Sequence, residues 1–402
     1  MIALPNLRHL KALQAVARLG SVGQASASIH VSQPAVTQAI AKLESQIGAP
    51  VFDRRPTGSY PTEFGNILLR RVDRFFAMME EGFSAIYGSS EVQDRSFSPV
   101  NMVTSTQIRS LVATTDPMTA TQTAVAMGVS ETALYRSARE LEQILNCRLF
   151  QASADGVINT PAGAELTRKI GLAIREIEYA LEEVEVAKGR AATQLSIGVL
   201  PMSASNVLSS AVDALTRRHP KVRIKIQEGT YLAMLNCLRL GQVDMNFGLL
   251  RRPDWVHDVV EEPLFDDSFC IVVRRGHPLQ HAKNLTRADL MQYEWVMPAP
   301  ATPRRRAIEE FFAGEPRTSY AVETGSLSII RSLLSNSDRI SVLSRHEVEM
   351  DDRGDRFSIL PLTLKRPSVK GVTTRANWLP TPLHLEFIEL LRSHTAQCAA
   401  RG

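Results

Sequence analysis

The sequence of 402 residues lacks the patterns that usually mark an enzyme, a metalloprotein or a membrane protein. It has no Walker-type glycine loop, no HExxH and no GxSxG, and its nine histidines do not cluster at metal-ligand spacing. No run of eighteen apolar residues occurs, so no membrane-spanning helix is expected. The sequence therefore predicts a protein that is not an enzyme, needs no metal or cofactor and has no membrane partner.

Cysteine is scarce and scattered: Cys147, Cys237, Cys270 and Cys398 form no CxxC pair. This spacing is typical of reduced thiols, buried or incidental, with a redox sensor as the alternative. The first residues, MIALPNLRHLKAL, mix charge into a helical pattern and do not form an apolar signal segment. With 44% hydrophobic and 22% charged residues, the chain is expected to be cytoplasmic and soluble, with two to four packed domains.

The clearest pattern present is an internal repeat, because the first sixty-odd residues recur without a gap 98 positions later. Each copy has the layout of a DNA-reading helix-turn-helix. The matched pairs include Val31 and Val129, Ser32 and Ser130, Ala35 and Ala133, Leu43 and Leu141, Glu44 and Glu142, and Phe52 and Phe150.

The two copies differ in charge. Residues 1–62 carry six Lys or Arg and two acids, a balance of +4, within a chain whose total net charge is also +4. Residues 101–160 carry four Arg and five acids, a balance of −1. Attraction to DNA phosphates therefore favours the first copy.

The first copy has a polar helix face that suits a major groove. Ser21 and Ser32 are expected to cap its two short helices through their hydroxyls, and Pro34 falls in the first turn of the second helix, where a missing N–H costs little. Gln can bond adenine bidentately, and Ser and Thr adapt to several bases. The predicted outward residues are Ser32, Gln33, Thr37, Gln38 and Lys42; the inward ones are Val36, Ile40, Leu43 and Ile47.

Arg54 and Arg55 stand before a Thr-Gly turn, as expected for a basic wing that grips the DNA backbone. The stretch VSQPAVTQAIAKLESQIGAPVFDRRPTGSYPTEFG closely resembles the winged helix-turn-helix signature of the LysR-type transcriptional regulators. The resemblance implies promoter or operator DNA as the partner, with Arg54 and Arg55 on phosphates. It also implies base-edge positions for Ser32, Gln33, Pro34, Thr37 and Gln38.

The second copy keeps the turn and core positions but loses this chemistry. Glu131 and Thr132 replace Gln33 and Pro34, and Ala152 and Ser153 replace the wing arginines, although Arg136 and Arg139 remain on the outer face. An acid at the start of this helix repels phosphate. Three interpretations remain open: a scaffold that dimerises or spaces the chain, a second reader of different specificity, and an unused relic. The family normally has one such domain.

Each winged copy is followed by a long helix with an apolar stripe at coiled-coil-like spacing. In the family that the sequence resembles, one such helix pairs two subunits, which implies a homodimer or homotetramer; the alternative is a plain core helix within its own chain. The stripes are Phe64, Leu68, Val72, Phe75, Met79, Phe83 and Ile86, and Leu166, Ile170, Ala173, Ile177, Leu181 and Val184.

From Gln194 onward short strands alternate with helices, which predicts a largely parallel α/β sheet. Residues 194–395 resemble the effector-binding portion of LysR-type regulators, itself similar to periplasmic solute-binding proteins with two Rossmann-like subdomains around a cleft. The expected domains are 1–62 and, degenerate, 101–160 (all-α winged units), 63–90 and 161–190 (linker helices), and 194–402 (effector domain; subdomain I 194–275 and 371–395, subdomain II 276–370).

Hydroxyl residues that follow strands and precede helices mark the expected cleft. A hydroxyl and the free N–H groups of a helix start can hold a ligand carboxylate, although each residue can equally be a simple helix cap. The four predicted effector residues are Ser203, Thr230, Thr302 and Ser326. The run Arg304 to Arg306 indicates a solvated helix start more than an anion clamp, and Phe247 and Phe269 are expected in the core.

The sequence therefore predicts a ligand-responsive, sequence-specific DNA-binding regulator. A small effector, an organic acid being one option, is expected in the C-terminal cleft, where its binding alters how paired winged domains engage a promoter. The alternative is a small-molecule-binding or oligomerisation module without a physiological DNA site.

Overall fold

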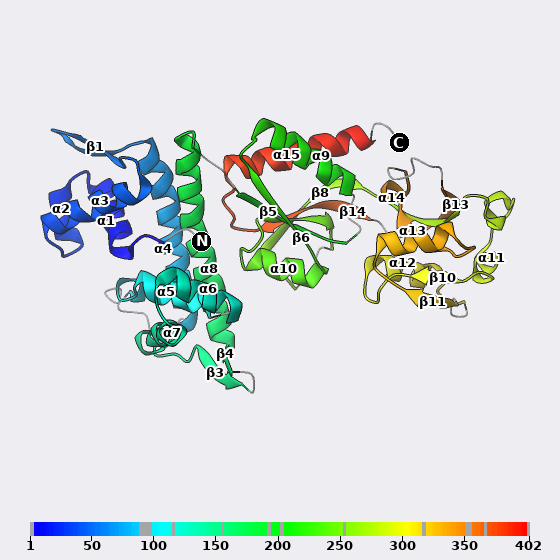
Figure 1. Cartoon of the computed structure of the whole chain (residues 1–402), viewed down its shortest axis with the longest axis horizontal. Coiled ribbons are helices and arrows are strands. Elements are labelled where there is room, and N and C mark those ends of the chain that lie inside the picture. Colours follow the sequence, from blue (N-terminus) through cyan, green and yellow to red (C-terminus); the bar gives the residue numbers. More distant parts are fainter. Residues whose placement is uncertain are drawn as a thin grey trace. The chain divides into compact units, whose positions relative to one another are not determined.

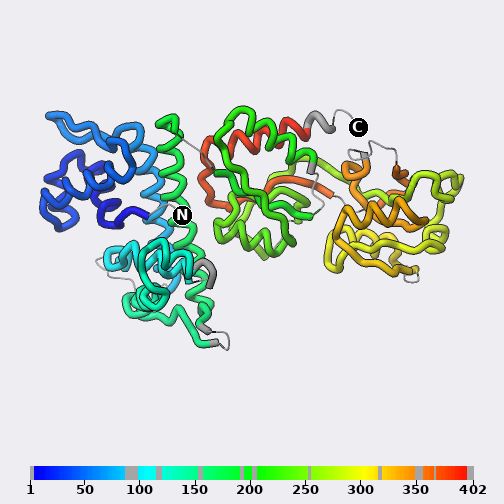
Figure 2. Tube along the Cα trace, in the orientation of Figure 1, coloured from blue at the N-terminus to red at the C-terminus, as the bar shows by residue number. Residues whose placement is uncertain are grey.

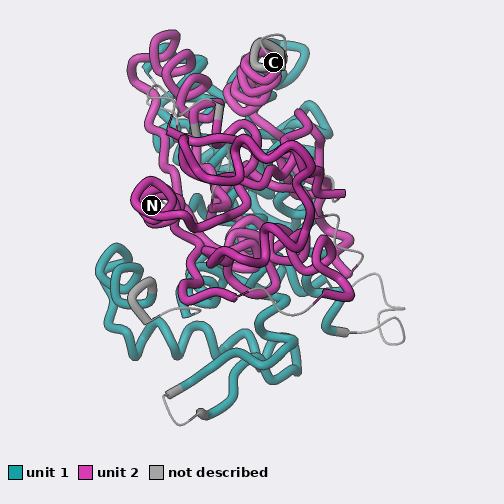
Figure 3. The backbone as a smooth tube through the Cα atoms, turned by 90° about the vertical axis from the view of Figure 1, so that its right-hand side faces the viewer, with its two compact units in different colours: residues 1–193 teal, residues 194–402 magenta. Residues whose placement is uncertain are grey.

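The computed structural model describes residues 4–87, 98–114, 117–153, 156–190, 194–201, 205–251, 255–315, 319–349, 356–365 and 368–399. The chain divides into two compact units, residues 1–193 and 194–402, which Figure 3 colours separately. Among the described residues, no helix is both long and apolar enough to cross a membrane.

The first unit contains two copies of one winged helix-turn-helix fold, each ending in a long helix (Figures 1 and 2). The recognition helices α3 and α7, like both wing hairpins, begin and end 98 positions apart. The first copy has α1 (Leu7–Leu19), α2 (Val22–Ser28), α3 (Gln33–Ile47), β1 (Phe52–Arg55), β2 (Gly58–Pro61) and α4 (Glu63–Tyr87). The second has η1 (Pro99–Asn101), α5 (Ser105–Ala113), α6 (Pro117–Met127), α7 (Glu131–Leu145), β3 (Phe150–Ser153), β4 (Gly156–Asn159) and α8 (Pro161–Ala187).

A glutamate near the end of each recognition helix ties that helix to the following wing. The Glu44 carboxylate accepts a hydrogen bond from the backbone N–H of Val51 at 2.9 Å, and the Glu142 carboxylate accepts one from Leu149 at 2.8 Å. Charged acceptors make the stronger hydrogen bonds. The acids retained in both copies therefore have a structural role, which explains why they recur although acids disfavour DNA.

A glycine in the first turn of each long helix allows the helix to lie against the chain that enters the wing. A Cβ built on Gly65 would stand 2.1 Å from the carbonyl oxygen of Val51, and one on Gly163 would stand 2.0 Å from that of Leu149. Side-chain atoms cannot approach backbone oxygen this closely. The repeat of glycine at this position therefore reflects packing in both copies.

Replacing Gly65 with alanine is expected to lower the free energy of unfolding of the first unit by about 2 kcal/mol or more, since the backbone must move to admit the methyl group. Gly23→Ala is the matched control, because Gly23 lies within α2 and a Cβ there would meet only Ser21 Oγ at 3.7 Å. That control should be neutral or stabilising by up to about 1 kcal/mol. Urea unfolding followed by far-ultraviolet circular dichroism measures both; equal effects would contradict the packing argument.

The two long helices pack against each other within the chain, side by side in Figure 1. They are antiparallel, since a Cβ built on Gly82 near the end of α4 would lie 3.4 Å from side-chain atoms of Leu166 and Lys169 near the start of α8. Their apolar stripes join one continuous core with both winged copies. Of the two arrangements that the stripes allowed, packing within the chain is therefore the one observed for both helices.

In the second unit, a five-stranded sheet of order β6-β5-β7-β14-β8 forms one subdomain, with β5 parallel to β6 and β7 and with β14 antiparallel to β7 and β8. The elements of this subdomain are β5 (Gln194–Val199), α9 (Ser205–Arg218), β6 (Arg223–Glu228), α10 (Tyr231–Arg239), β7 (Met245–Leu249), β8 (Val259–Asp266), β14 (Val369–Arg375) and α15 (Pro382–Ala399).

A three-stranded sheet of order β12-β9-β13 and a parallel pair β10-β11 form the other subdomain, which has its own cores. Its elements are β9 (Phe269–Arg274), η2 (Pro278–His281), α11 (Arg287–Met291), β10 (Trp295–Met297), α12 (Pro303–Phe311), β11 (Tyr320–Glu323), α13 (Leu327–Ser335), β12 (Ser341–Ser344), α14 (Arg345–Glu349) and β13 (Phe357–Thr363).

The predicted boundary at residue 275 between the two subdomains needs a correction. We placed residues 269–275 with the first subdomain, but β9 pairs with β12 and β13 and packs in the core of the second. The chain therefore crosses over between β8 and β9. β8 and β9 follow each other along the chain, and the order of strands in a sequence does not show which sheet each strand joins.

Candidate functional site

The outer face of α3 is polar and open to solvent. Gln33, Pro34, Gln38 and Lys42 are exposed, whereas Thr37 is half-buried and its hydroxyl donates to the Gln33 carbonyl oxygen at 3.1 Å. This bond uses the hydroxyl hydrogen of Thr37 and leaves the oxygen as an acceptor. The face therefore presents two side-chain amides and one ammonium group to a partner.

Ser32 lies at the N-cap of α3, but the prediction that its hydroxyl caps the helix is wrong, because its side chain makes no capping hydrogen bond. Pro34 removes one of the N–H groups that such a hydroxyl would reach. In the second copy, Ser130 does cap, accepting from the Ala133 N–H at 3.2 Å. The Ser32 hydroxyl is therefore available to an external ligand and the Ser130 hydroxyl is not. The predicted cap at Ser21 is confirmed, with a bond from Gln24.

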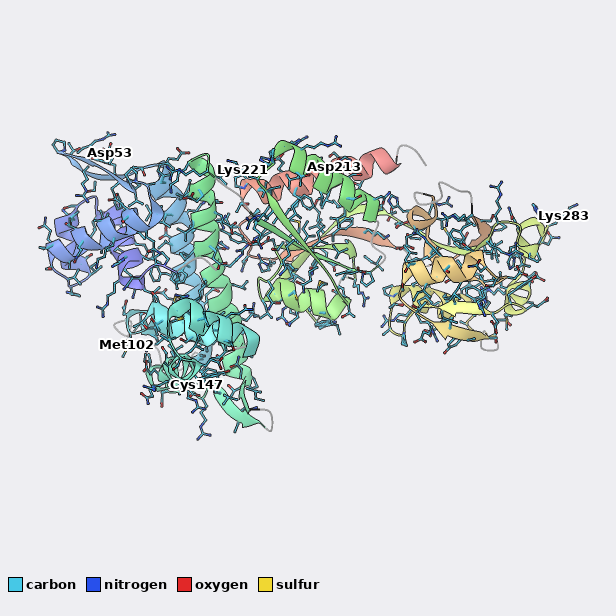
Figure 4. The ribbon with its side chains drawn as sticks, in the orientation of Figure 1. Asp53, Met102, Cys147, Asp213, Lys221 and Lys283 are labelled. Carbon is cyan, nitrogen blue, oxygen red and sulfur yellow. The ribbon has the colours of Figure 1, made fainter. Side chains whose placement is uncertain are left out.

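The wing of the first copy is the hairpin β1-β2, on which Figure 4 labels Asp53. Arg54 is exposed, and no ion pair to it is found among the described residues. Arg55 pairs with Asp53 at 2.8 Å and lies over the ring of Tyr60, at 5.6 Å from its centre. The side chains of Arg55 and Asp53 are 62% and 50% exposed, so this ion pair is weak. A DNA phosphate can therefore compete with Asp53 for the guanidinium.

Two exposed acids of the second winged copy bond to neighbouring side chains. Glu131 accepts a hydrogen bond from Thr121 at 2.6 Å, and Glu140 accepts one from Gln107 at 3.0 Å. Arg136 and Arg139 are exposed on the outer face of α7, and the described part of the chain offers neither an ion pair. These two arginines can therefore reach DNA phosphates although the net charge of this copy is negative.

In the second unit, a pocket of about 420 Å³ lies between the two sheets, at the ends of strands and the starts of helices. Strand ends are the usual ligand site of open α/β sheets. Its lining comes from the ends of β5 and β7, the starts of α10, α12 and α13, and parts of β9 and β14.

Three of the four predicted effector residues line this pocket: Thr230, Thr302 and Ser326. Thr230 Oγ1 caps α10 through the Ala233 N–H at 3.3 Å, and Thr302 Oγ1 caps α12 and donates to the Ala299 carbonyl. Ser326 caps no backbone group of α13 and lies 3.0 Å from Ser328 Oγ. Thr230 and Thr302 are therefore helix caps that also line the pocket, whereas Ser326 lines the pocket without capping a helix. The fourth, Ser203, lies outside the described residues.

Three further pocket residues, Tyr231, Arg251 and Ser368, were not predicted from the sequence. Tyr231 and Ser368 are buried, at 8% and 2% exposed, and neither hydroxyl has a hydrogen-bond partner among the described residues. A buried polar group without a partner costs free energy, so such a group lining a pocket indicates a place for a ligand atom. No sequence motif marks these residues. The one indication in the sequence is that Tyr231 directly follows Thr230, which was predicted to line the cleft.

Arg251 gives the pocket a cation. Its guanidinium lies 4.4 Å from the centre of the Tyr231 ring, and burial lowers the pKa of Arg251 from its ordinary value. Burial, together with the nearby carboxylate of Glu261, raises the pKa of Tyr231 to about 12, so the phenol keeps its proton at neutral pH and can donate. A protonated phenol beside a guanidinium favours an anionic ligand.

Arg304 to Arg306 were predicted to be a solvated helix start, and the structure differs from this prediction. Arg304 is buried, donating to Glu347 at 3.0 Å and to the Val342 carbonyl, and Arg305 pairs with Glu309. Only Arg306 is exposed, so the run is not a solvated helix start as a whole. The run is misleading in the sequence because three consecutive helical residues point in three directions.

The predicted core phenylalanines are buried as expected, Phe247 fully and Phe269 at 5% exposed, and Phe269 also contributes to the pocket wall. Of the cysteines, Cys270 is buried while Cys147, labelled in Figure 4, and Cys237 are half-buried free thiols. The side chain of Cys398 lies outside the described residues. No group of potential metal ligands occurs in the part of the chain that is described.

Comparison with known proteins identifies both units. The family model for the bacterial regulatory helix-turn-helix protein, lysR family, matches twice, at residues 7–66 and 105–164. The HTH-type transcriptional regulator GalR of Pseudomonas putida is 29% identical over 394 residues, covering 97% of this chain and 98% of GalR. PcaQ of Agrobacterium fabrum is 28% identical over 261 residues, 64% of this chain and 84% of PcaQ.

Among solved structures, a full-length OxyR variant from Pseudomonas aeruginosa aligns with a TM-score of 0.55 at 21% identity, covering 72% of this chain and 93% of OxyR. That likeness supports the fold. The LysR substrate binding domain model matches residues 188–396, which is more than half of the chain. The relatives are transcriptional regulators and not enzymes. The chain therefore belongs to the LysR family of transcriptional regulators, proteins that bind DNA and a small-molecule effector and act as oligomers.

Proposed function

We propose that the first winged copy reads operator DNA through α3 and its wing. In this proposal Ser32, Gln33, Pro34, Thr37 and Gln38 lie at base edges, and Lys42, Arg54 and Arg55 contact phosphates. The observation that carries it is the exposed, acid-free face of α3 together with the uncapped Ser32 hydroxyl and the open wing arginines.

This assignment gives each segment of the chain a function. Residues 1–62 are the reader, 63–90 and 161–190 the long helices, 101–160 the second winged copy and 194–402 the sensor. The regulator works without enzymatic chemistry in the cytoplasm, where it meets its DNA. Electrophoretic mobility shifts with the DNA upstream of its own gene test whether residues 1–62 bind DNA. If no salt-sensitive, sequence-selective complex forms, the alternative holds, namely a binding module without a physiological DNA site.

We further propose that the pocket of the second unit binds an organic anion. Arg251 supplies the positive charge, and Tyr231 and Ser368 supply hydroxyls that have no hydrogen-bond partner in the part of the chain that is described. Thr230, Thr302 and Ser326 stand at the starts of three helices, whose N–H groups favour negative charge. Ser203 is retained as a fourth hydroxyl of this site.

A panel of small aliphatic and aromatic carboxylic acids, added to the full chain, is expected to raise the melting temperature of the second unit. A ligand at one hundred times its Kd stabilises by about 2.7 kcal/mol. Arg251→Ala should abolish this rise and Tyr231→Phe should weaken it, because each removes a group that contacts the anion. Intrinsic tryptophan fluorescence follows this unit, which holds Trp255, Trp295 and Trp378.

Arg287→Ala is the matched control for Arg251→Ala, because Arg287 also lies over an aromatic ring, Phe311, but does not line the pocket. It should leave every ligand response unchanged. An acid that stabilises the wild type and the Arg251→Ala variant equally would place the anion elsewhere.

A further inference from the structure

The two winged copies of the first unit are related by an approximate two-fold rotation. Residues 98 positions apart are equivalent, and the equivalent helices α4 and α8 pack antiparallel. The end of α4, at Gly82, meets the start of α8, at Lys169, while Arg71 of α4 meets Glu176 and Glu183 farther along α8. Antiparallel packing of two equivalent helices is the geometry that a two-fold axis produces.

A second contact identifies where this axis passes. The backbone N–H of Leu7 donates to Ser105 Oγ at 3.0 Å, and these two residues occupy equivalent positions, 98 apart. A residue can touch its own equivalent only near the rotation axis. Lys11 supports the same junction, donating at 2.7 Å to the Val100 carbonyl and to the Asn101 side chain.

We propose that each chain is its own DNA-reading dimer: the second winged copy takes, within the chain, the place of a partner subunit's reader. One chain then offers two recognition helices and two wings to a single DNA duplex. In the first half-site of the DNA, α3 contacts the edges of the bases. In the second half-site, Arg136 and Arg139 of α7 contact mainly the phosphates of the DNA backbone. This proposal rests on the DNA-binding role proposed above for the first copy.

Buried charges specify that α4 pairs with α8 and not with another α4. Arg71 is fully buried, and its guanidinium bonds both Glu176 and Glu183 at 2.8 Å. The α4 residues equivalent to those two acids are Met78 and Ala85. Two paired α4 helices would therefore bury two arginines opposite apolar side chains, and an unpaired buried charge is strongly unfavourable.

The reverse pair, two α8 helices, would keep its charges matched, because Lys169 is the equivalent of Arg71 and would face Glu176 and Glu183. If two chains exchange their α4–α8 pairs for pairs of identical helices, each α8–α8 pair is nevertheless accompanied by one α4–α4 pair. The cost of the α4 pair therefore opposes the exchange as a whole.

The apolar stripe of α4 is also already covered. Phe75, Met79 and Phe83 are at most 1% exposed within the single chain. No comparable stripe on the described part of α4 is left for a second chain. In addition, the two copies belong to one covalent chain, which raises their effective concentration toward each other and favours pairing within the chain.

A disulfide between α4 and α8 tests whether the pair forms within one chain. A Cβ built on Gly82 lies 3.4 Å from the Cβ of Lys169, close to the separation in disulfides. The full-length Gly82→Cys/Lys169→Cys variant, oxidised and run on a non-reducing gel, is expected to give one species of monomer mass whose mobility reverts on reduction. A covalent dimer at this site, or two thiols that stay reactive after oxidation, would overturn the proposal.

The single variants Gly82→Cys and Lys169→Cys, oxidised in parallel, show any bonding to the native cysteines. Circular dichroism checks that the helices form. If the double variant does not fold, Glu81→Cys/Lys169→Cys provides a second pair, joined by a short bifunctional thiol crosslinker, since the ends of the Glu81 and Lys169 side chains lie 4.0 Å apart across the same helices. Its outcomes are judged in the same way.

DNA binding of the locked protein tests the functional half of the proposal. The oxidised double variant should bind operator DNA within about two-fold of its reduced form. Loss of binding that reduction restores would show that the intrachain pair is not the DNA-binding form. If neither form binds any DNA selectively while the disulfide is intrachain, the DNA-reading function fails and the pairing stands.

Arg136→Ala/Arg139→Ala tests the contribution of the second copy. Losing two phosphate contacts should lower the slope of log K against log salt by about 2 and weaken operator and unrelated DNA alike. The ratio between the two affinities should stay unchanged. A variant with wild-type affinity and slope would show that the second copy stays off the DNA and would overturn the two-half-site arrangement.

Discussion

Replacing Arg71 with methionine is expected to lower the free energy of unfolding of the first unit by about 3–5 kcal/mol, a loss of more than 100-fold in its folding equilibrium constant. Arg71 is fully buried between α4 and α8, and its guanidinium neutralises Glu176 and Glu183, which are 5% and 8% exposed. Burial by itself lowers the pKa of Arg71, but the hydrogen bonds to the two glutamates outweigh it and raise that pKa above its ordinary value. The arginine therefore stays charged, and its removal leaves Glu183 and Glu176 with only Arg70 and Arg74, both partly exposed, as ion partners.

Two readouts separate the units in this experiment. All three tryptophans lie in the second unit, so the fluorescence transition should stay in place while the circular dichroism transition of the helical first unit shifts to lower urea. Arg70→Met is the matched control: Arg70 also bonds Glu183, at 2.9 Å, but its side chain is 53% exposed. That variant should lose less than about 1 kcal/mol.

Rescue completes the test. Combining Arg71→Met with Glu176→Gln and Glu183→Met removes the two acidic charges and should recover most of the lost stability, because apolar replacements of buried ion pairs are often neutral. If the triple variant is as unstable as Arg71→Met alone, side-chain packing at Arg71 and not its charge holds the helices together.

Replacing Arg54 and Arg55 with alanine is expected to weaken binding to every DNA sequence, by roughly 60-fold at 0.1 M salt. Each phosphate contact contributes about 0.9 to the slope of log K against log salt, so the slope should become shallower by about 2. The two side chains point from an exposed hairpin, and the Asp53 pair of Arg55 is weak. Fluorescence anisotropy at several salt concentrations measures affinity and slope together.

Arg217→Ala/Lys221→Ala is the matched control, because it removes the same net charge from the exposed surface of the second unit, near the Asp213 and Lys221 labels of Figure 4. Its salt slope should equal that of the wild type. If instead the wing variant kept the wild-type slope while Arg136→Ala/Arg139→Ala abolished binding, the roles assigned to the two copies would be reversed.

The local structure followed well from the sequence. The 98-residue repeat, the polar face of α3 and the wing hairpin were all readable, because helix periodicity, a glycine-containing turn and charge are local properties. The capping of Ser32 was mispredicted although its position was right. A cap needs an N–H within reach, and the neighbouring proline removed one.

The pocket was only partly predictable. Thr230, Thr302 and Ser326 were found from their places between strands and helices, whereas Tyr231, Arg251 and Ser368 were not. The latter three come from a helix, the end of β7 and the approach to β14, and they converge only when the two sheets face each other. Residues brought together over more than one hundred positions leave no spacing for a sequence pattern to reveal.

By itself, the sequence determined that this chain is a LysR-type regulator with a duplicated winged copy, one cationic and one not. Only the tertiary structure decided what the duplicated long helices do. Both carry the same apolar stripe, and hydrophobic burial has no direction, so the stripe cannot say whether its partner lies in the same chain or in another. The buried contacts of Arg71 with two acids, absent from the equivalent places in α4, supply the asymmetry that matches α4 to α8.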